Sequence, residues 1–371
     1  MDGLVDEPRS HYNLSLKEFV RQGNWASAIL LLDSMRSRGG NLTPDVDTYS
    51  SMLCTEVLHN GCDLSRVLEV LERASEHLSN GLLENVFEDA VRKVAEAGHA
   101  EQAAILLTEH ADRLGAQPNV PLYECALVSC AKKGLSGRVY NLLAIMNDNG
   151  LIPTQRIYTI AIKCCGAKVW RALKYLDEMI SNEVQPNTIT YACAISVCKN
   201  AKRWREAKKL IHEMRECSIF PNEVAFANAI HACSRAGEWT EALALLDLMK
   251  KEGPRPNVVC YTAALGACAK ANQWQSVLDL IDEMRNVNVP PNEITYGLAI
   301  RACANAGEWH EVVALYSAMA SSCEVSEVSD EILVHAVTAF SAIGDRRSVV
   351  ELSQVLKVRP ETRVITAALS H

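Results

Sequence analysis

Cysteine is the residue type whose number and spacing in this chain most suggest chemistry. Of its 14 cysteines, six recur about every 35 residues: Cys130, Cys165, Cys198, Cys233, Cys268 and Cys303. A zinc site needs several thiolates around one ion, typically from CxxC pairs, and the sequence has no such pair. One cysteine per 35 residues instead places neighbours on successive helices. We therefore interpret this ladder as small buried core residues and expect no metal.

Tryptophan forms a second ladder, which consists of Trp25, Trp204, Trp239, Trp274 and Trp309. Indole rings in a row could stack on nucleic-acid bases, or they could pack between repeats, since tryptophan is usually well buried. We favour packing, because each tryptophan opens the second helix of a predicted helix pair.

Enzyme motifs are missing from the sequence. It contains no HExxH, no Gly-rich phosphate loop and no GxSxG, and His310-Glu311 lacks the second histidine of a zinc motif. We therefore predict a protein that is not an enzyme, with no cofactor and no small-molecule substrate.

Charge is unevenly distributed along the 371 residues, which carry a net charge of −8. Residues 1–119 hold 10 Lys and Arg against 19 Asp and Glu, whereas residues 155–292 hold 18 against 14. The acidic N-terminal part could dock a basic partner protein, and the mildly basic centre is the better place for nucleic acid. No run of 18 apolar residues is present, so we expect no membrane span.

The N-terminus gives an expectation about location. Residues 1–8 contain no apolar run, which argues against a secretory signal and for reduced thiols in an intracellular compartment. Asp2, Asp6 and Glu7 argue against an intact transit peptide, which is poor in acidic residues.

A 35-residue repeat organises the chain, because the Trp and Cys ladders share their step with Met214, Met249, Met284 and Met319 and with four Pro-Asn pairs. The landmarks divide the chain into an N-terminal extension (1–8), ten repeats and the start of a further repeat or a C-terminal cap (362–371). The predicted repeats are 9–45, 46–83, 84–119, 120–154, 155–187, 188–222, 223–257, 258–292, 293–329 and 330–361.

Each repeat is predicted to be two helices. In 223–257 the first helix has an apolar stripe, which consists of Val224, Ala227, Ile230 and Ala232–Cys233, and Gly237 ends this helix. The second helix has its own stripe, which consists of Trp239, Ala242, Leu245, Leu246 and Met249. Neither helix buries its stripe alone, so the repeats must stack into an all-α solenoid.

These landmarks resemble the pentatricopeptide repeat pattern over residues 9–361. The match consists of a Tyr in the first helix (Tyr12, Tyr49, Tyr123, Tyr158, Tyr191, Tyr261 and Tyr296), followed by Cys, Gly, Ala, Met and Pro-Asn or Pro-Asp at set offsets. The resemblance implies a right-handed superhelical solenoid of helix-turn-helix repeats and a single-stranded RNA partner. It also implies an organelle, either the mitochondrion or the chloroplast.

The resemblance further implies which residues read bases. Such proteins read one base per repeat with two or three side chains, and the family uses the residue after the Tyr and the residue after the closing Pro. The candidate pairs are Asn13 with Asp45, Thr159 with Asn187, and Thr262 with Asn292. The family associates the first pair with uracil and the other two with adenine. The alternative for these asparagines is a purely structural one, as helix N-caps.

A basic residue two positions before the turn between the helices binds backbone phosphate in this family. The aligned residues are Arg21, Lys132, Arg235 and Lys270, although they could also simply favour the C-terminal dipole of their own helix.

Three repeats lack a side chain that could read a base, because Ala192, Ala227 and Gly297 follow the aromatic residue, and two others carry Glu88 and Glu124 there. The main hypothesis is an RNA-binding adaptor in organellar RNA processing, stabilisation or translation. The alternative is a protein-binding scaffold, such as a subunit of a mitochondrial ribosome or another organellar complex.

Overall fold

A computed structural model of the chain describes residues 7–38, 42–59, 61–322 and 329–358. Over these residues the protein is all-helical, without a strand. The N-terminal extension, apart from the start of the first helix, and the predicted C-terminal element 362–371 lie outside the described residues.

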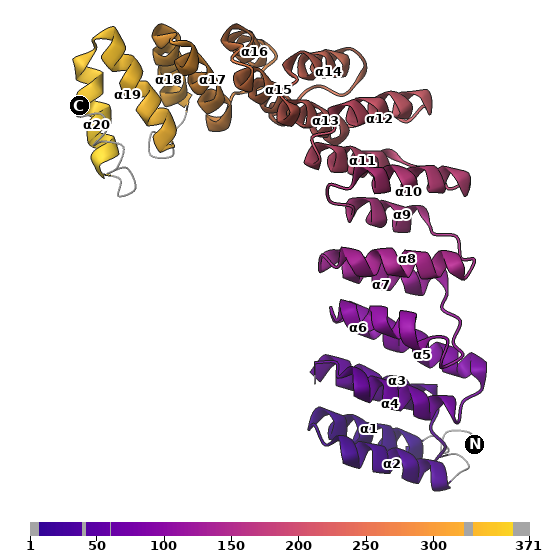
Figure 1. Cartoon of the computed structure of the whole chain (residues 1–371). Coiled ribbons are helices and arrows are strands. Elements are labelled where there is room, and N and C mark those ends of the chain that lie inside the picture. The colour runs from indigo at the N-terminus through magenta and orange to yellow at the C-terminus, as the bar shows by residue number, and fades with distance from the viewer. Residues whose placement is uncertain (1–6, 39–41, 60, 323–328, 359–371) are drawn as a thin grey trace. The chain divides into compact units, whose positions relative to one another are not determined.

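The helices follow one another in pairs (Figure 1). They are α1 (Glu7–Arg21), α2 (Trp25–Arg38), α3 (Val46–His59), α4 (Leu64–Ser75), α5 (Asn80–Glu96), α6 (Ala100–Ile105) continued by the π-helix η2 (Leu106–His110), α7 (Val120–Lys132), α8 (Ser136–Asp148), α9 (Gln155–Lys163), α10 (Val169–Ser181), α11 (Thr188–Asn200), α12 (Trp204–Glu216), α13 (Glu223–Ala236), α14 (Trp239–Glu252), α15 (Val258–Lys270), α16 (Trp274–Asn286), α17 (Glu293–Ala306), α18 (Trp309–Ser322), α19 (Asp330–Ile343) and α20 (Arg346–Val358).

The chain forms two compact units, and the division passes through α10. The N-terminal unit comprises residues 1–165 and 174–185, and the C-terminal unit comprises residues 166–173 and 186–371. In both units the first helix of a pair packs against its own second helix and against the first helix of the next pair. This is the solenoid arrangement predicted from the sequence.

The pair α13/α14 shows how the sequence sets the ends of each helix. The Asn222 side chain accepts a hydrogen bond from the backbone N–H of Ala225 (2.9 Å) and so caps the start of α13. Gly237 ends this helix with φ at +85°, a left-handed conformation that glycine adopts without strain. The N–H of Glu238 then returns to the carbonyl of Cys233 (3.0 Å).

The predicted stripe of the first helix is correct at Ile230, Ala232 and Cys233, which are buried, and wrong at its N-terminal end. Phe226 and Ile230 are buried in α13, whereas Val224 is 57% exposed and Ala227 is half-buried. Phe226 is the largest apolar residue of this helix, so its burial fixes the rotation of the helix and leaves Val224 in solvent. The predicted stripe of α14 is buried at Ala242, Leu245, Leu246 and Met249, whereas its first residue, Trp239, is half-buried.

Tyrosine joins the two helices of several repeats. Tyr191 and Tyr261 are fully buried, and their hydroxyls donate to the second-helix carboxylates of Glu213 (3.1 Å) and Glu283 (2.8 Å). These hydrogen bonds satisfy a polar group that burial would otherwise leave without water.

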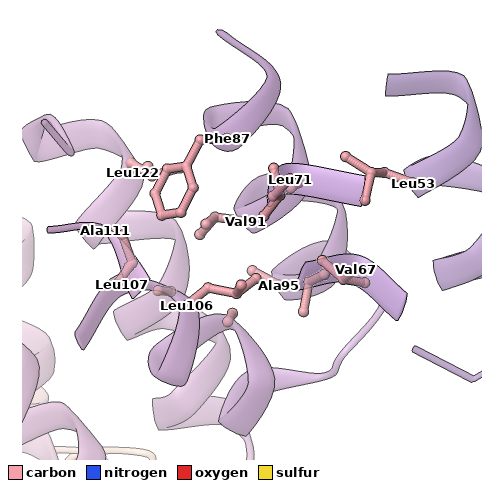
Figure 2. Packing of buried hydrophobic residues seen from close by; sticks show 14 of the residues in the cluster. Leu53, Val67, Leu71, Phe87, Val91, Ala95, Leu106, Leu107, Ala111 and Leu122 are labelled. Carbon is pink, nitrogen blue, oxygen red and sulfur yellow. The ribbon is translucent and has the colours of Figure 1, made fainter. Parts of the chain in front are cut away.

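The core of the N-terminal unit gathers side chains from successive helices. Figure 2 shows residues from α3, α4, α5, η2 and α7 in one apolar cluster, among them Leu53, Leu71, Phe87, Leu107 and Leu122. The six-cysteine ladder is buried as predicted. Burial raises the pKa of the Cys130 thiol to about 11 and that of Cys233 to about 12, so these thiols stay protonated at neutral pH.

The five tryptophans of the ladder are half-buried. Trp25 donates its Nε1–H to Glu69 of the next repeat's second helix (2.7 Å). Trp25 thus joins two repeats, and all five tryptophans lie on second helices.

Candidate nucleic-acid interface

The first helices present a surface that their own second helices leave uncovered. In α13, Val224, Ala227, Asn228, His231 and Arg235 are exposed or half-buried, and each lies three or four residues from another member of the set. This spacing puts them on one side of the helix. We call the exposed and half-buried residues of α11, α13, α15, α17 and α19 the first-helix surface of the C-terminal unit.

Thr262 and Asn292 meet on this surface through a third residue, Thr295. The Thr295 hydroxyl donates to Asn292 Oδ1 (2.7 Å) and lies 3.2 Å from the Thr262 hydroxyl. Thr295 also gives its backbone N–H to Asn292 Oδ1 (2.9 Å), which caps α17. The predicted pair is therefore a contiguous polar site between α15 and the start of α17.

Asn13 and Asp45 form the equivalent site in the N-terminal unit, again through a threonine. The Thr48 hydroxyl lies 2.9 Å from Asn13 Oδ1 and 2.8 Å from Asp45 Oδ1. Asp45 also pairs with Arg9 (2.7 Å). Burial by itself would raise the pKa of Asp45, but the hydrogen bonds from Thr48 and the charge of Arg9 lower it below the usual value.

Thr159 belongs to the N-terminal unit and Asn187 to the C-terminal unit. The Thr159 hydroxyl donates to the carbonyl of Gln155 one turn back (2.8 Å). Asn187 caps α11 by accepting from the N–H of Thr190 (2.9 Å).

The asparagines that follow proline act as helix N-caps, which is the structural alternative to base reading. Asn119, Asn187, Asn222, Asn257 and Asn292 each accept an N–H through Oδ1 at a helix start. Capping leaves the Nδ2 amide as a donor, so it is compatible with reading a base. Among the residues that the structure describes, no protein acceptor takes this amide at Asn187 or Asn292.

At two of the predicted base-reading positions a glutamate carboxylate bonds to neighbouring protein groups. Glu88 accepts from the amide of Asn119 (2.6 Å). Glu124 accepts from the Thr154 hydroxyl (3.2 Å) and pairs with Arg156 (2.8 Å). Both glutamates are thus engaged with the residues that would otherwise face a base.

Packing accounts for two of the three remaining departures, Ala192 and Gly297. Ala192 is buried, and a Cβ added to Gly297 would lie 2.9 Å from Cδ1 of Ile332 in α19. The absence of a reading side chain at Gly297 therefore follows from the close approach of α17 and α19.

The four predicted phosphate residues are all exposed. Arg21 is 4.0 Å from Glu18, and Lys132 lines two hollows of about 350 and 510 Å³ in the N-terminal unit. Arg235 donates to the carbonyl of Lys199 (3.4 Å), and Lys270 donates to that of Ser234 (3.0 Å). Arg235 and Lys270 thus contact carbonyls at the C-terminal end of a helix, as the helix-dipole alternative predicts. The helix in each case is the first helix of the preceding repeat and not their own.

Sequence reasoning missed two features of the surface. The first is a row of exposed aliphatic side chains, Ile189, Val224, Val259 and Ile294, which are 52–64% exposed. Their 35-residue step is visible in the sequence, but helical periodicity assigned Val224 to the core. The second feature is Lys199 with His231. Lys199 escaped notice because the aligned position belongs to its neighbour Asn200.

Within the described ranges, no group of three or more His, Cys, Asp or Glu is placed to hold a metal ion. The same part of the chain has no helix with both the length and the apolar character of a membrane span.

Stacked helix pairs with capped first helices define a helical-repeat protein. Residues 153–337 match the family model described as the pentacotripeptide-repeat region of PRORP. A pentatricopeptide repeat-containing protein of Arabidopsis thaliana is 30% identical over 95 residues, which are 25% of this chain and 18% of that protein. The chain belongs to the pentatricopeptide repeat family, as its repeat landmarks predicted.

Two solved structures are similar to this chain. One is the pentatricopeptide repeat protein PPR10, known from maize, in complex with an 18-nt psaJ RNA element. It is 22% identical with a TM-score of 0.42, and the match covers 94% of this chain and 53% of that one. The other is the PPR domain of Arabidopsis thaliana protein-only RNase P 1 in complex with tRNA. It is 19% identical with a TM-score of 0.43, and the match covers 47% of this chain and 94% of that domain.

Proposed function

We propose that this chain binds single-stranded RNA on the first-helix surface of its C-terminal unit. The observation that carries the proposal is the coincidence of three features on α13, α15 and α17. Polar groups that can read a base, exposed aliphatic side chains and uncompensated cations all lie on this surface. Family membership supports the same function.

The polar site at Thr262 and Asn292 suits the edge of a base. Asn292 offers the donor Nδ2–H, and the Thr262 hydroxyl, which the neighbouring groups hold in place, lies beside it. Ile294 and Val259 lie in the first turns of the flanking helices, where an exposed aliphatic side chain can cover the face of a base. Family resemblance assigns adenine to this pair.

Cations further along the same helices would hold the RNA backbone. Arg235 and Lys270 are exposed, and their contacts with carbonyl oxygens leave their charge uncompensated. Each phosphate neutralised on a single strand adds about 0.7 to the salt slope, so binding by a few such cations is moderately salt-sensitive.

As part of the proposal, the chain acts by binding alone, in organellar RNA processing, stabilisation or translation in the mitochondrion or chloroplast. Covering a short RNA segment would block nucleases or keep the segment unpaired. The state of the cysteine ladder supports a role without catalysis, because burial raises the pKa of its thiols and keeps them protonated.

A protein-binding scaffold is the second candidate, and the N-terminal unit favours it. In this unit Glu88 and Glu124 occupy reader positions and are paired with protein groups. A surface of this kind suits a basic protein segment better than phosphate. The two functions can coexist, one in each unit.

Selection from a pool of random single-stranded RNA at 100 and 300 mM salt tests the RNA function, followed by sequencing of the retained RNA. We expect salt-sensitive enrichment of a short motif with adenine at one position. Thr262→Ala and Asn292→Ala should each cost ~1–3 kcal/mol and relax the preference at that position alone. Ser317→Ala on the second helix α18, which lies outside the first-helix surface, is the control. No retention at the lower salt would overturn the proposal and direct attention to protein partners.

A further inference from the structure

A group of basic residues lies on the first-helix surface of the C-terminal unit, beyond the base-reading site. It consists of Lys199 on α11, His231 and Arg235 on α13, and Lys270 on α15, and we call it the basic cluster. The three helices are neighbours, because α13 packs against both α11 and α15.

Every cation of this cluster is held by an uncharged oxygen. Lys199 Nζ donates to Asn228 Oδ1 (2.8 Å), and Arg235 and Lys270 donate to backbone carbonyls. Among the described residues, no carboxylate lies within ion-pair distance of any of the three. Their positive charges therefore attract an anion that the protein itself does not supply.

The carboxylates of the neighbouring second helices act elsewhere. Glu206 of α12 and Glu241 of α14 affect the buried thiols of Cys198 and Cys233, which face the second helices. By contrast, the charged groups that act on His231 are Lys199, Arg235 and Lys270, which come from α11, α13 and α15. The histidine thus has basic neighbours from every first helix packed around it.

We propose that the basic cluster binds one backbone phosphate of RNA and that His231 takes up a proton as the phosphate binds. RNA affinity of the C-terminal unit then rises as pH falls. This inference rests on the proposed RNA-binding function, which already includes Arg235 and Lys270, and adds Lys199, His231 and a dependence on pH to it. His231 is four residues from Ala227, so it lies about 6 Å along α13 from the reader position, within reach of the adjoining backbone.

The direction of the pH effect follows from the surroundings of His231. Burial, and then the charges of Lys199, Arg235 and Lys270, lower the pKa of His231 in the free protein. The imidazole is therefore neutral at neutral pH. A phosphate among these cations offsets their charge and raises the pKa of the imidazole. Because linkage is reciprocal, protonation of His231 must strengthen phosphate binding by the same factor.

The test measures binding of a fluorescent mixed-sequence single-stranded RNA to the full chain between about pH 6 and pH 8, where the histidine titrates and unpaired bases do not. We expect affinity to rise several-fold toward pH 6, with ~10-fold per pH unit as the limit for one proton. His231→Gln should abolish this rise. His212→Gln, on the exposed side of α12, should keep it.

Two results separate this inference from the proposed function. RNA binding that is independent of pH, or equal in His231→Gln and wild type at every pH, would overturn the proton uptake and leave RNA binding intact. If no RNA binds at any pH, NMR titration of the His231 imidazole with and without inorganic pyrophosphate tests whether the basic cluster by itself binds phosphate. A raised pKa with pyrophosphate supports the site, and an unchanged pKa refutes it.

Discussion

Thr295→Val tests whether the base-reading site is one hydrogen-bonded unit. Thr295 is fully buried, and its hydroxyl touches both Asn292 and Thr262. Its loss removes hydrogen bonds of ~0.5–1.5 kcal/mol each, while the added buried methyl returns about 0.8 kcal/mol. We therefore expect a net loss of about 1 kcal/mol, which corresponds to a melting shift of about 2–4 °C for a unit of this size. The Asn292 cap survives, because the backbone N–H of Thr295 still donates to it.

Denaturant unfolding of Thr295→Val, Thr262→Val and the double variant measures this effect. The two changes should couple by about 0.5–1 kcal/mol, since their hydroxyls share one contact. Thr338→Val is the control, because the Thr338 hydroxyl donates to the Val334 carbonyl of its own helix. An unfolding midpoint for Thr295→Val equal to that of wild type, together with strictly additive effects, would refute the reasoning.

Three further predictions concern packing and pH. Ala242→Leu should cost ~1–3 kcal/mol by overpacking the helix crossing, whereas Ala244→Leu on the exposed side of α14 should cost little, as denaturant unfolding would show. Gly297→Thr should destabilise the C-terminal unit because of the contact with α19, whereas Ala227→Thr, where the site is half-buried, should be tolerated; equal melting temperatures would contradict this. Stability should fall as pH rises from 9 toward 12, because burial raises the pKa of the Cys233 thiol from 9.0 to about 12, and a flat alkaline profile of unfolding free energy would contradict it.

The fold was predictable because it depends on residues that recur. Proline, asparagine, glycine and tryptophan mark helix starts and ends by local backbone preferences, which act within one repeat. Periodicity failed at Val224, because the buried face of α13 depends on how Phe226 packs against a neighbouring helix. The pattern of apolar residues along α13 does not define which face is buried, because small apolar residues lie on several sides of the helix.

The candidate site was predictable only in part, for the same physical reason. Alignment located Thr262 and Asn292, but the bridging role of Thr295 depends on contact between two repeats. The pairing of Glu88 with Asn119 and the contact of Gly297 with Ile332 are also inter-repeat effects. His231 was missed because its significance comes from three cations on three different helices.

The central claim is that RNA lies on the first-helix surface of the C-terminal unit. Ultraviolet crosslinking of the full chain to single-stranded RNA, followed by mass spectrometry of the crosslinked peptides, tests it most directly. We predict crosslinks in α13, α15 and α17, near the exposed residues Val224, Val259 and Ile294. Crosslinks confined to the second helices α12, α14 and α16, or to the N-terminal unit, would contradict it.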